Sequence, residues 1–248
     1  MFFQRYGSVW IGKSNLLSDI PWIEHGISTI KGGNSRPPFS SLNVAYQTND
    51  NPDHVRSNRQ RLFECVGIVE SHLCEANQVH GDSIAAVSSD GEYADTDGFV
   101  SREAGLVLSI RTADCVPVFL VDAHQRAIGL VHAGWRGTAQ SIAMKAVEKM
   151  ILHFGSQPQN LHCFVGPSIG PCCYEVGSEV ADAAGETYIR QSRLDMWRWN
   201  RDQLRSSGIP EKQIEISRLC TACHSEWFFS HRKSGGNTGR MLSYLMIK

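Results

Sequence analysis

The sequence predicts a mixed α+β fold in which helices and strands form packed layers. Short apolar runs separated by Gly, Asp and Ser fill residues 71–122, as expected for strands, and helical patterns lie on both sides of this region. The two kinds of element do not alternate strictly, which favours an α+β sandwich over a doubly wound parallel sheet. We find no internal repeat or long linker, so we expect one domain over residues 1–248.

The first half of the chain predicts a loop, a helix and then a sheet. Residues 31–41 contain two glycines and two prolines, so we expect an irregular loop there and interpret it as a mobile flap near the site. Residues 52–66 have the pattern of an amphipathic helix that begins after Asn51 or Asp53. Strands are then expected at the apolar runs 84–87, 98–100, 106–110 and 116–121.

The second half begins with a strand that leads into a helix. Residues 127–135 predict a buried strand ending at Gly134, and residues 138–154 have apolar side chains at helical spacing. His132 and Arg136 therefore lie in a strand-to-helix turn, where helix N-terminal amides favour an anion. A strand at 161–167, a loop containing Gly170, two helical segments and a last strand at 241–247 follow.

Composition and charge exclude several classes of function. The 24 Lys and Arg residues balance 25 Asp and Glu residues, so nucleic acid and anionic membranes are not expected partners. No apolar run approaches the roughly 20 residues that cross a bilayer, and the N-terminal sequence has no signal-peptide pattern. We expect a cytoplasmic protein whose eight cysteines are reduced.

Three glycine-containing motifs carry the chemistry, and each lies at the expected end of a strand: NQVHG (77–81), TADCVPV (112–118) and HAGWRG (132–137). His80, Cys115 and His132 would supply the three protein ligands of a catalytic zinc ion, with a fourth position open to water or substrate. Their spacing matches no short ligand pattern. A hydrogen-bonded structural histidine and a core cysteine are the alternatives.

Seven stretches of the sequence together resemble a known family. They appear in order along nearly the whole chain: SLNVAYQTNDNPDHVRSNRQRL (41–62), NQVHG, ADTDGFVS (94–101), TADCVPVFLVD (112–122), VHAGWRGT (131–138), GPSIGPCCYEVG (166–177) and FFSHRKSGGNTGR (228–240). The chain is similar to the YfiH-type family, also called the laccase-domain or polyphenol oxidase family, whose members are treated as purine nucleoside phosphorylases. The resemblance implies a four-layer αββα sandwich with zinc on His80, Cys115 and His132.

The resemblance also implies activities and partners. These are phosphorolysis of adenosine, inosine, guanosine and methylthioadenosine to base and ribose 1-phosphate, together with adenosine deamination. The expected partners are therefore a purine nucleoside and phosphate, with copper as a substitute for zinc, and the chain is expected to be a monomer or a weak homodimer.

Five further residues are candidates for the reaction and for substrate binding. Arg136 is the first candidate for the phosphate seat and Arg111 the second, because phosphorolysis needs a cationic group. Asp114 would act as general base or orient a ligand imidazole if the strand bends there, which Pro117 favours. Asn43 and Gln78 are candidates for substrate binding, although Asn and Gln in loops more often satisfy backbone groups.

Other interpretations stay open. The same zinc ligands would suit an amidase that removes a misincorporated serine from a UDP-muramyl peptide, with residues 31–41 and 231–233 beside an extended groove. Copper-dependent phenol oxidation is disfavoured by only 10 histidines. A structural zinc site would need a fourth ligand, for which His124, Cys74 and Cys163 are candidates. We interpret CTACH (220–224) as a coincidental haem motif and place Cys172 and Cys173 in loop packing.

Overall fold

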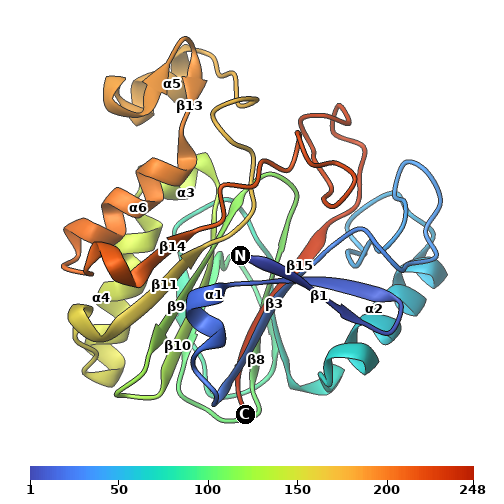
Figure 1. The fold of residues 1–248 in the computed structure, drawn as a ribbon, viewed down its shortest axis with the longest axis horizontal. Helices are drawn as coiled ribbons and strands as arrows, with labels where there is room; N and C mark the ends of the chain where they lie inside the picture. Colours follow the sequence, from blue (N-terminus) through green and yellow to red (C-terminus); the bar gives the residue numbers. More distant parts are fainter.

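A computed structural model describes residues 1–248, and two mixed sheets form its centre (Figure 1). The first sheet contains, in order across it, β1 (Phe2–Tyr6), β2 (Val9–Lys13), β3 (Ile23–Ser28), β15 (Met241–Ile247), β8 (Val107–Thr112), β4 (Leu73–Ala76) and β6 (Gly91–Tyr93). The second contains β14 (Ile214–Ile216), β11 (Leu161–Val165), β9 (Val116–Asp122), β10 (Ala127–Ala133), β7 (Gly98–Ser101) and β5 (Ile84–Ala86). Each sheet combines antiparallel and parallel pairs, so the predicted mixed α+β class is confirmed.

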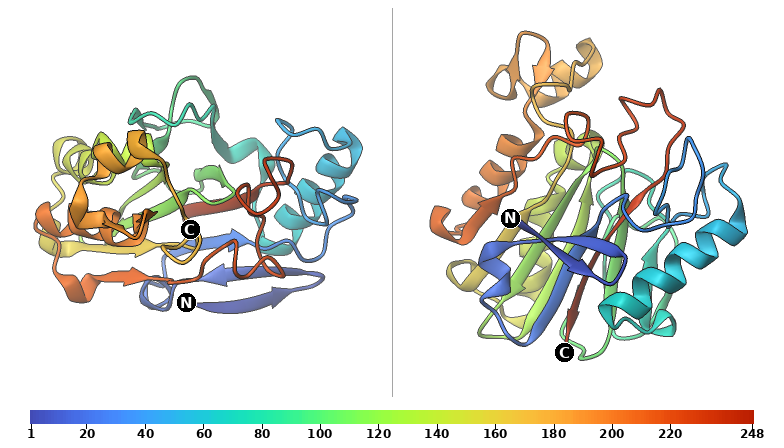
Figure 2. Two further views of the ribbon diagram at one scale, coloured as in Figure 1. Left: turned by 90° about the horizontal axis from the view of Figure 1, so that it is seen from above. Right: turned by 45° about the vertical axis from the view of Figure 1, so that its right-hand side comes forward.

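Six helices complete the fold, with two strands that pair apart from the main sheets. The helices are α1 (Asn15–Ser18), α2 (Pro52–Val66), α3 (Trp135–Ala139), α4 (Ile142–Phe154), α5 (Ser178–Ala184) and α6 (Met196–Ser206). The small hairpin is formed by β12 (Ile189–Arg190) and β13 (Arg193–Leu194). Figure 1 shows α4 and α6 on one side of the sheets and α2 on the opposite side, and the two views of Figure 2 agree.

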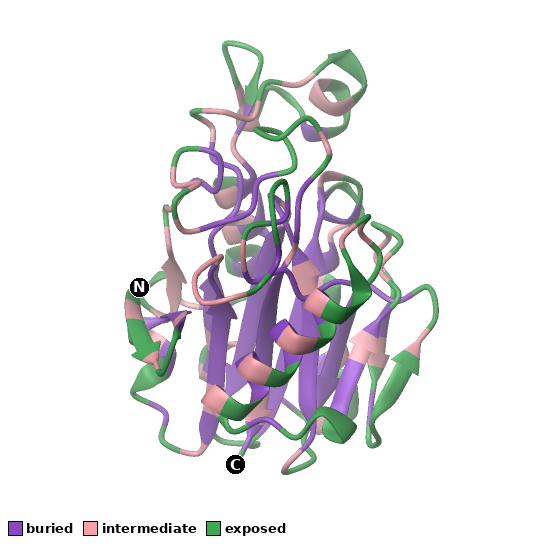
Figure 3. Cartoon of the chain, turned by 90° about the vertical axis from the view of Figure 1, so that its right-hand side faces the viewer, coloured by how far each residue is buried: buried purple, intermediate pink, exposed green.

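Three apolar clusters hold these parts together. One lies between the two sheets and includes Leu108, Phe119 and Leu245. A second packs the outer face of the second sheet against α4 and α6, and a third packs the first sheet against α2. Figure 3 shows the result: the central strands are buried along their lengths, while parts of the edge strands and the outward faces of the helices are exposed. The ends of the central strands are therefore fixed by packing on both faces.

Several predicted elements are confirmed. Helix α2 spans residues 52–66, and the Asn51 side chain accepts the backbone N–H of Asp53 as its N-cap. The last strand spans residues 241–247 as expected, and the apolar runs of residues 84–122 form β5, β7, β8 and β9.

One expectation about the helices needs correction. The single helix expected over residues 138–154 is broken into α3 and α4, because Ser141 has a φ of 63° and interrupts the helical backbone. The N-terminal residues, for which the sequence analysis made no assignment, contribute three strands and α1.

No helix combines the length and apolarity that crossing a membrane requires.

Candidate metal centre

His80, Cys115 and His132 meet at one edge of the two sheets. His132 is the next-to-last residue of β10, Cys115 lies in the turn between β8 and β9, and His80 lies in the loop that follows β4. Their potential ligand atoms all lie within 4.8 Å of one another. The three residues that the sequence predicted as metal ligands are therefore brought together, although they come from separate elements.

Asp97 fixes the positions of two of these residues through hydrogen bonds. The fully buried carboxylate lies 2.8 Å from Nδ1 of His132, and it accepts backbone N–H groups from Val79, His80 and Gly81 at 3.2, 3.1 and 2.8 Å. It thus holds the His132 ring and the His80 loop in one arrangement. Because Nδ1 is occupied, Nε2 of His132 is the nitrogen available to a metal ion.

The charges of the centre favour a thiolate. Burial raises the pKa of Cys115, but the positive charge of His132 and hydrogen bonds from His132 and His80 outweigh it and lower the pKa to about 6. Burial lowers the pKa of His132, but the Cys115 thiolate and Asp97 outweigh it and raise the pKa to about 9. The same contact with His132 lowers the pKa of Asp97 against the effect of burial. A preformed thiolate beside two imidazoles is a donor set that zinc and copper accept.

Gly134 leaves the space in which such an ion would sit. A Cβ atom at this position would lie 3.2 Å from Cδ2 of His80, 3.5 Å from Sγ of Cys115 and 3.9 Å from Cε1 of His132. Gly134 has a φ of −70° and a ψ of 169°, which any residue can adopt. The glycine is therefore explained by space at the three ligands rather than by backbone conformation, and the residues present fit a single metal ion.

A cavity of about 510 Å³ opens onto the three ligands. This volume is within the range of small-molecule sites. Its lining combines apolar side chains, such as Ile169, Tyr174 and Met196, with a group of arginines: Arg111, Arg136, Arg232 and Arg240. A half-apolar, strongly cationic cavity suits a small organic molecule that carries or accompanies an anion.

Arg136 and Arg111 both line this cavity, as the phosphate hypothesis requires. Arg136 is more than half exposed, lies 3.6 Å from Glu179 and stacks on Trp135, with 4.3 Å from its Cζ to the ring centroid. The guanidinium of Arg111 is largely buried, which lowers its pKa, and it donates to the carbonyl of Ala76. Helix α3 has only five residues, so the helix that follows His132 is shorter than expected.

Gln78 and Asp114 also line the cavity, but their polar atoms are engaged. Gln78 pairs with the backbone of Arg111, donating to its carbonyl at 2.9 Å and accepting its N–H at 2.8 Å. Asp114 lies outside the strands with a φ of 89°, so the bend that its role requires is present. Its carboxylate accepts the Thr221 hydroxyl at 2.5 Å and the Arg232 N–H at 2.7 Å.

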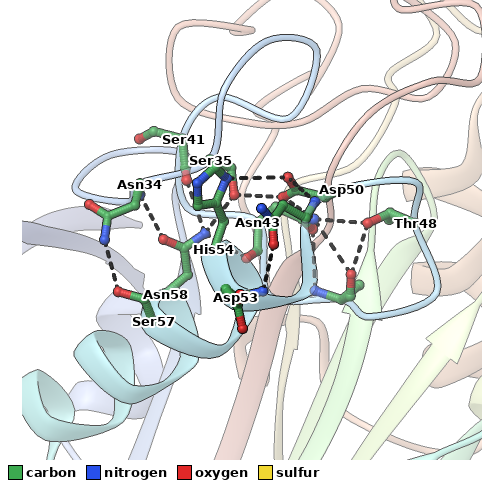
Figure 4. Close-up of polar contacts among 12 residues, drawn as sticks. Asn34, Ser35, Ser41, Asn43, Thr48, Asp50, Asp53, His54, Ser57 and Asn58 are labelled. Carbon is green, nitrogen blue, oxygen red and sulfur yellow. Dashed lines mark hydrogen bonds and ion pairs between the residues drawn. The ribbon is translucent and has the colours of Figure 1, made fainter.

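Asn43 does not line the cavity. It is fully buried, and its amide nitrogen donates to Thr48 at 2.9 Å and to Asp50 at 3.0 Å, while its oxygen accepts the N–H groups of Ala45 and Arg240 (Figure 4). This geometry supports a structural role in the loop before α2 and no direct contact with substrate.

The expected flap at residues 31–41 also lies outside the cavity lining. Asn58 of α2 accepts the Asn34 N–H at 2.7 Å and donates to Ser35, Ser41 and Asn43 (Figure 4). The glycines and prolines of this loop therefore allow an irregular backbone that is hydrogen-bonded to α2. The interpretation of the loop as a mobile flap near the site is wrong.

The structure adds residues that the sequence analysis did not single out. Asp97 is the main one, and its only signal was a carboxylate in the motif ADTDGFVS, between the strands that carry the ligands. Tyr174 and Arg240 line the cavity from segments that are remote in sequence. Burial raises the pKa of Tyr174 to about 12, so its hydroxyl stays protonated.

The model of a known family, described as "Multi-copper polyphenol oxidoreductase laccase", matches residues 24–248. The chain belongs to this laccase-domain family. Among its relatives, "Purine nucleoside phosphorylase YlmD" of Geobacillus stearothermophilus is 38% identical over 243 residues, covering 89% of this chain and 88% of the relative. "Purine nucleoside phosphorylase YfiH" of Escherichia coli is 34% identical, covering 89% and 92%. The crystal structure of YlmD from G. stearothermophilus has a TM-score of 0.91 at 33% identity and covers 99% of this chain and 98% of that one.

Membership in the laccase-domain family confirms the resemblance drawn from the seven motifs. Both of these relatives are named as purine nucleoside phosphorylases.

Proposed function

We propose that the chain is a zinc-dependent purine nucleoside phosphorylase that converts adenosine, inosine, guanosine or methylthioadenosine and phosphate to the free base and ribose 1-phosphate. One observation carries the proposal: a thiolate and two imidazoles lie at a cavity that is also lined by four arginines. The first group suits a metal ion and the second suits a phosphate, and both face the same space.

The arginines differ in how free they are to bind an anion. Arg232 and Arg240 have no carboxylate within ion-pair distance, whereas Arg111 and Arg136 each lie 3.6 Å from a glutamate oxygen. Arg232 donates to the carbonyl of Glu175, and Arg240 donates to the carbonyls of Thr238 and Gly239. We therefore place phosphate near Arg232 and Arg240 and keep Arg136 and Arg111 as its further partners.

The remaining lining has roles in binding and orientation. Zinc held by His80, Cys115 and His132 would supply Lewis-acid chemistry at the reacting group. Ile169, Met196 and the Tyr174 ring offer apolar surface to a purine base. Asp114 orients the cavity wall, since it ties Thr221 and Arg232 to the turn that carries Cys115.

Adenosine deamination belongs to the same proposal as a second activity of the same site. Attack of water on the purine carbon that carries the amino group needs the metal and the base pocket but no phosphate. Phosphate dependence therefore separates the two reactions. Copper is the alternative occupant because its preferred ligands include the same thiolate and imidazoles.

The test is product analysis of zinc-loaded protein with adenosine, with and without phosphate. We expect adenine and ribose 1-phosphate only with phosphate, inosine in both conditions, and neither product from the Cys115→Ala variant. Inosine alone would leave the deaminase and reject the phosphorylase. Absence of turnover would reject nucleoside substrates and direct the assay to the muramyl-peptide amide and, with copper-loaded protein, to phenols.

A further inference from the structure

Four of the remaining cysteines form a second cluster of ligand atoms on a segment near the cavity. The members of this four-cysteine cluster are Cys172, Cys173, Cys220 and Cys223. Two lie in the turn after β11 and two in the turn after β14, so they are distant in sequence. Their sulfur atoms all lie within 4.8 Å of one another. The sequence analysis assigned Cys172 and Cys173 to loop packing, and it interpreted CTACH, which contains Cys220 and Cys223, as a coincidental haem motif.

The distances between these sulfur atoms match ligands of one ion. Sγ of Cys223 lies 3.5 Å from that of Cys172 and 3.4 Å from that of Cys173. A disulfide would require about 2.05 Å. Four thiolates at about 2.3 Å from a tetrahedral zinc ion lie about 3.8 Å apart. The observed spacing is therefore close to that of a tetrathiolate site and far from that of a disulfide.

The backbone around Cys220 is arranged as in a site for a thiolate. The N–H of Gly170 donates to Sγ of Cys220 at 3.3 Å, which links the two turns at the sulfur itself. Backbone pairing of Ser168 with Leu219 and Thr221 keeps the turns in register. Such outer contacts orient metal ligands.

Cys220 and Cys223 lie in a long connection between two strands. Residues 217–240 join β14 to β15 without any helix or strand. Connections of this length without secondary structure are uncommon in compact domains and are usually functional or disordered. The apolar cluster beside the cysteines contains only three buried residues, namely Ile169, Cys220 and Ala222. Apolar burial there is small, so an ion would add a large part of the local stability.

We propose that the four-cysteine cluster binds one zinc ion through all four thiolates, as a closed structural site distinct from the open centre at Cys115. Binding forms four zinc–sulfur bonds and releases the protons of the thiols. Four protein ligands leave no position for substrate, and all-sulfur tetrahedral donors select zinc or an iron–sulfur centre. A single ion fits the sulfur spacing, which favours zinc.

The proposed ion would fasten two walls of the substrate cavity to each other. The first turn is flanked by Ile169 and Tyr174, which line the cavity. The second carries Thr221, whose hydroxyl donates to Asp114 at 2.5 Å. The four-cysteine site would therefore hold the wall that faces Cys115 without contacting the substrate.

Zinc stoichiometry under reducing, anaerobic conditions tests the proposal. Metal-free protein is titrated with zinc chloride against a chromophoric chelator. We expect two tight equivalents for the wild type, one for Cys115→Ala and one for Cys223→Ser. The matched control is Cys65→Ser, which changes a cysteine outside both clusters and should keep two.

X-ray absorption of Cys115→Ala loaded with one zinc equivalent gives an independent reading that needs no variant of the four-cysteine cluster. An all-sulfur shell at about 2.3 Å would support the site even if Cys223→Ser fails to fold. One equivalent in the wild type and none in Cys115→Ala would overturn it. Disulfides among these cysteines in the freshly isolated protein, or iron in place of zinc, would overturn it too.

Discussion

Asp97 is a buried residue that positions the candidate metal ligands without being a ligand itself. It contacts His132 through a side chain and the His80 loop through three backbone groups, so it sets the positions of two ligands at once. Outer contacts of this kind fix the tautomer and orientation of ligand histidines. The effect of removing its charge should therefore appear in metal affinity before it appears in folding.

Replacement of Asp97 by asparagine should weaken zinc binding at the Cys115 centre by about 10- to 100-fold. The amide keeps the shape but loses one acceptor and the negative charge beside His132. Competition with a chelator measures the change, and circular dichroism reports the fold. Asp95→Asn is the matched control, since Asp95 is exposed in the same turn. Equal zinc affinity in Asp97→Asn and wild type would contradict the role given to Asp97.

Residue identities predicted the candidate ligands but not the residues that position them. His80, Cys115 and His132 could be selected because their side chains bind metals and lie next to glycines at strand ends. Asp97 could not, because carboxylates are common and its importance depends on a distance between two strands. Asn43 illustrates the converse: its residue type suits substrate binding, yet the fold buries its amide among backbone and loop partners.

At the scale of elements, the turn from β10 to α3 decides whether the metal fits. Gly134→Ala should lower zinc affinity by about tenfold, because its methyl group would press on the ring of the ligand His80. Gly177→Ala is a close control. Gly177 also precedes a helix with extended backbone, but a Cβ there meets nothing within 4 Å. Isothermal titration with zinc compares the two, and equal losses in both variants would indicate a capping effect instead.

Elements were predictable where local pattern and packing agree. The apolar and polar faces of α2 predict a helix, and the apolar run of β15 predicts a buried strand. The break at Ser141 was not predictable, because the apolar spacing of α4 extends without interruption across a residue in left-handed conformation. The loop at residues 31–41 was misread because its composition indicates irregular backbone and carries no information on which helix fastens it.

The attachment of that loop to α2 gives a second prediction at this scale. Asn58→Ala should lower the free energy of unfolding by about 2–3 kcal/mol, since several buried polar groups lose their partner. It should also speed amide hydrogen exchange in residues 33–43. Urea unfolding and exchange followed by mass spectrometry measure both effects. Gln60→Ala, on the exposed face of the same helix, should change neither. Unchanged exchange in Asn58→Ala would show that the loop is held by other contacts.

At the scale of the whole molecule, the site depends on the packing of one sheet on the other. β8 and β4 belong to the first sheet and β9 and β10 to the second, so the loop after β4, the β8–β9 turn and the end of β10 meet only when the two sheets are packed together. The sequence could indicate strands and a mixed class, but a register between two sheets depends on contacts among residues that are far apart. The three motifs and the family resemblance both indicated the candidate ligands, and the packing of the two sheets explains why they meet.

The packing between the sheets also buries a histidine, which should make the stability of the molecule depend on pH. His25 in β3 is 2% exposed, packs edge-on against Phe119 of β9, and accepts the Ser14 N–H at 3.0 Å. Burial and the nearby charge of Lys13 lower its pKa from 6.5 to about 3. Between these values the unfolded chain binds a proton that the native protein does not. The contribution of neutral His25 is therefore complete above pH 6.5 and declines as pH falls towards 3.

His25→Gln keeps an acceptor for Ser14 but removes this titration. From pH 7.5 to pH 5.5 the wild type should lose about 1.4 kcal/mol more stability than His25→Gln, because one pH unit below 6.5 corresponds to that free energy. Urea unfolding at both pH values measures the difference, and acid effects on the metal ligands cancel in the comparison. His72→Gln, at an exposed position, should behave as the wild type. Parallel losses in wild type and His25→Gln would mean that protonation of His25 in the native state is tolerated, and that the two sheets separate or admit water near β3 at mildly acidic pH.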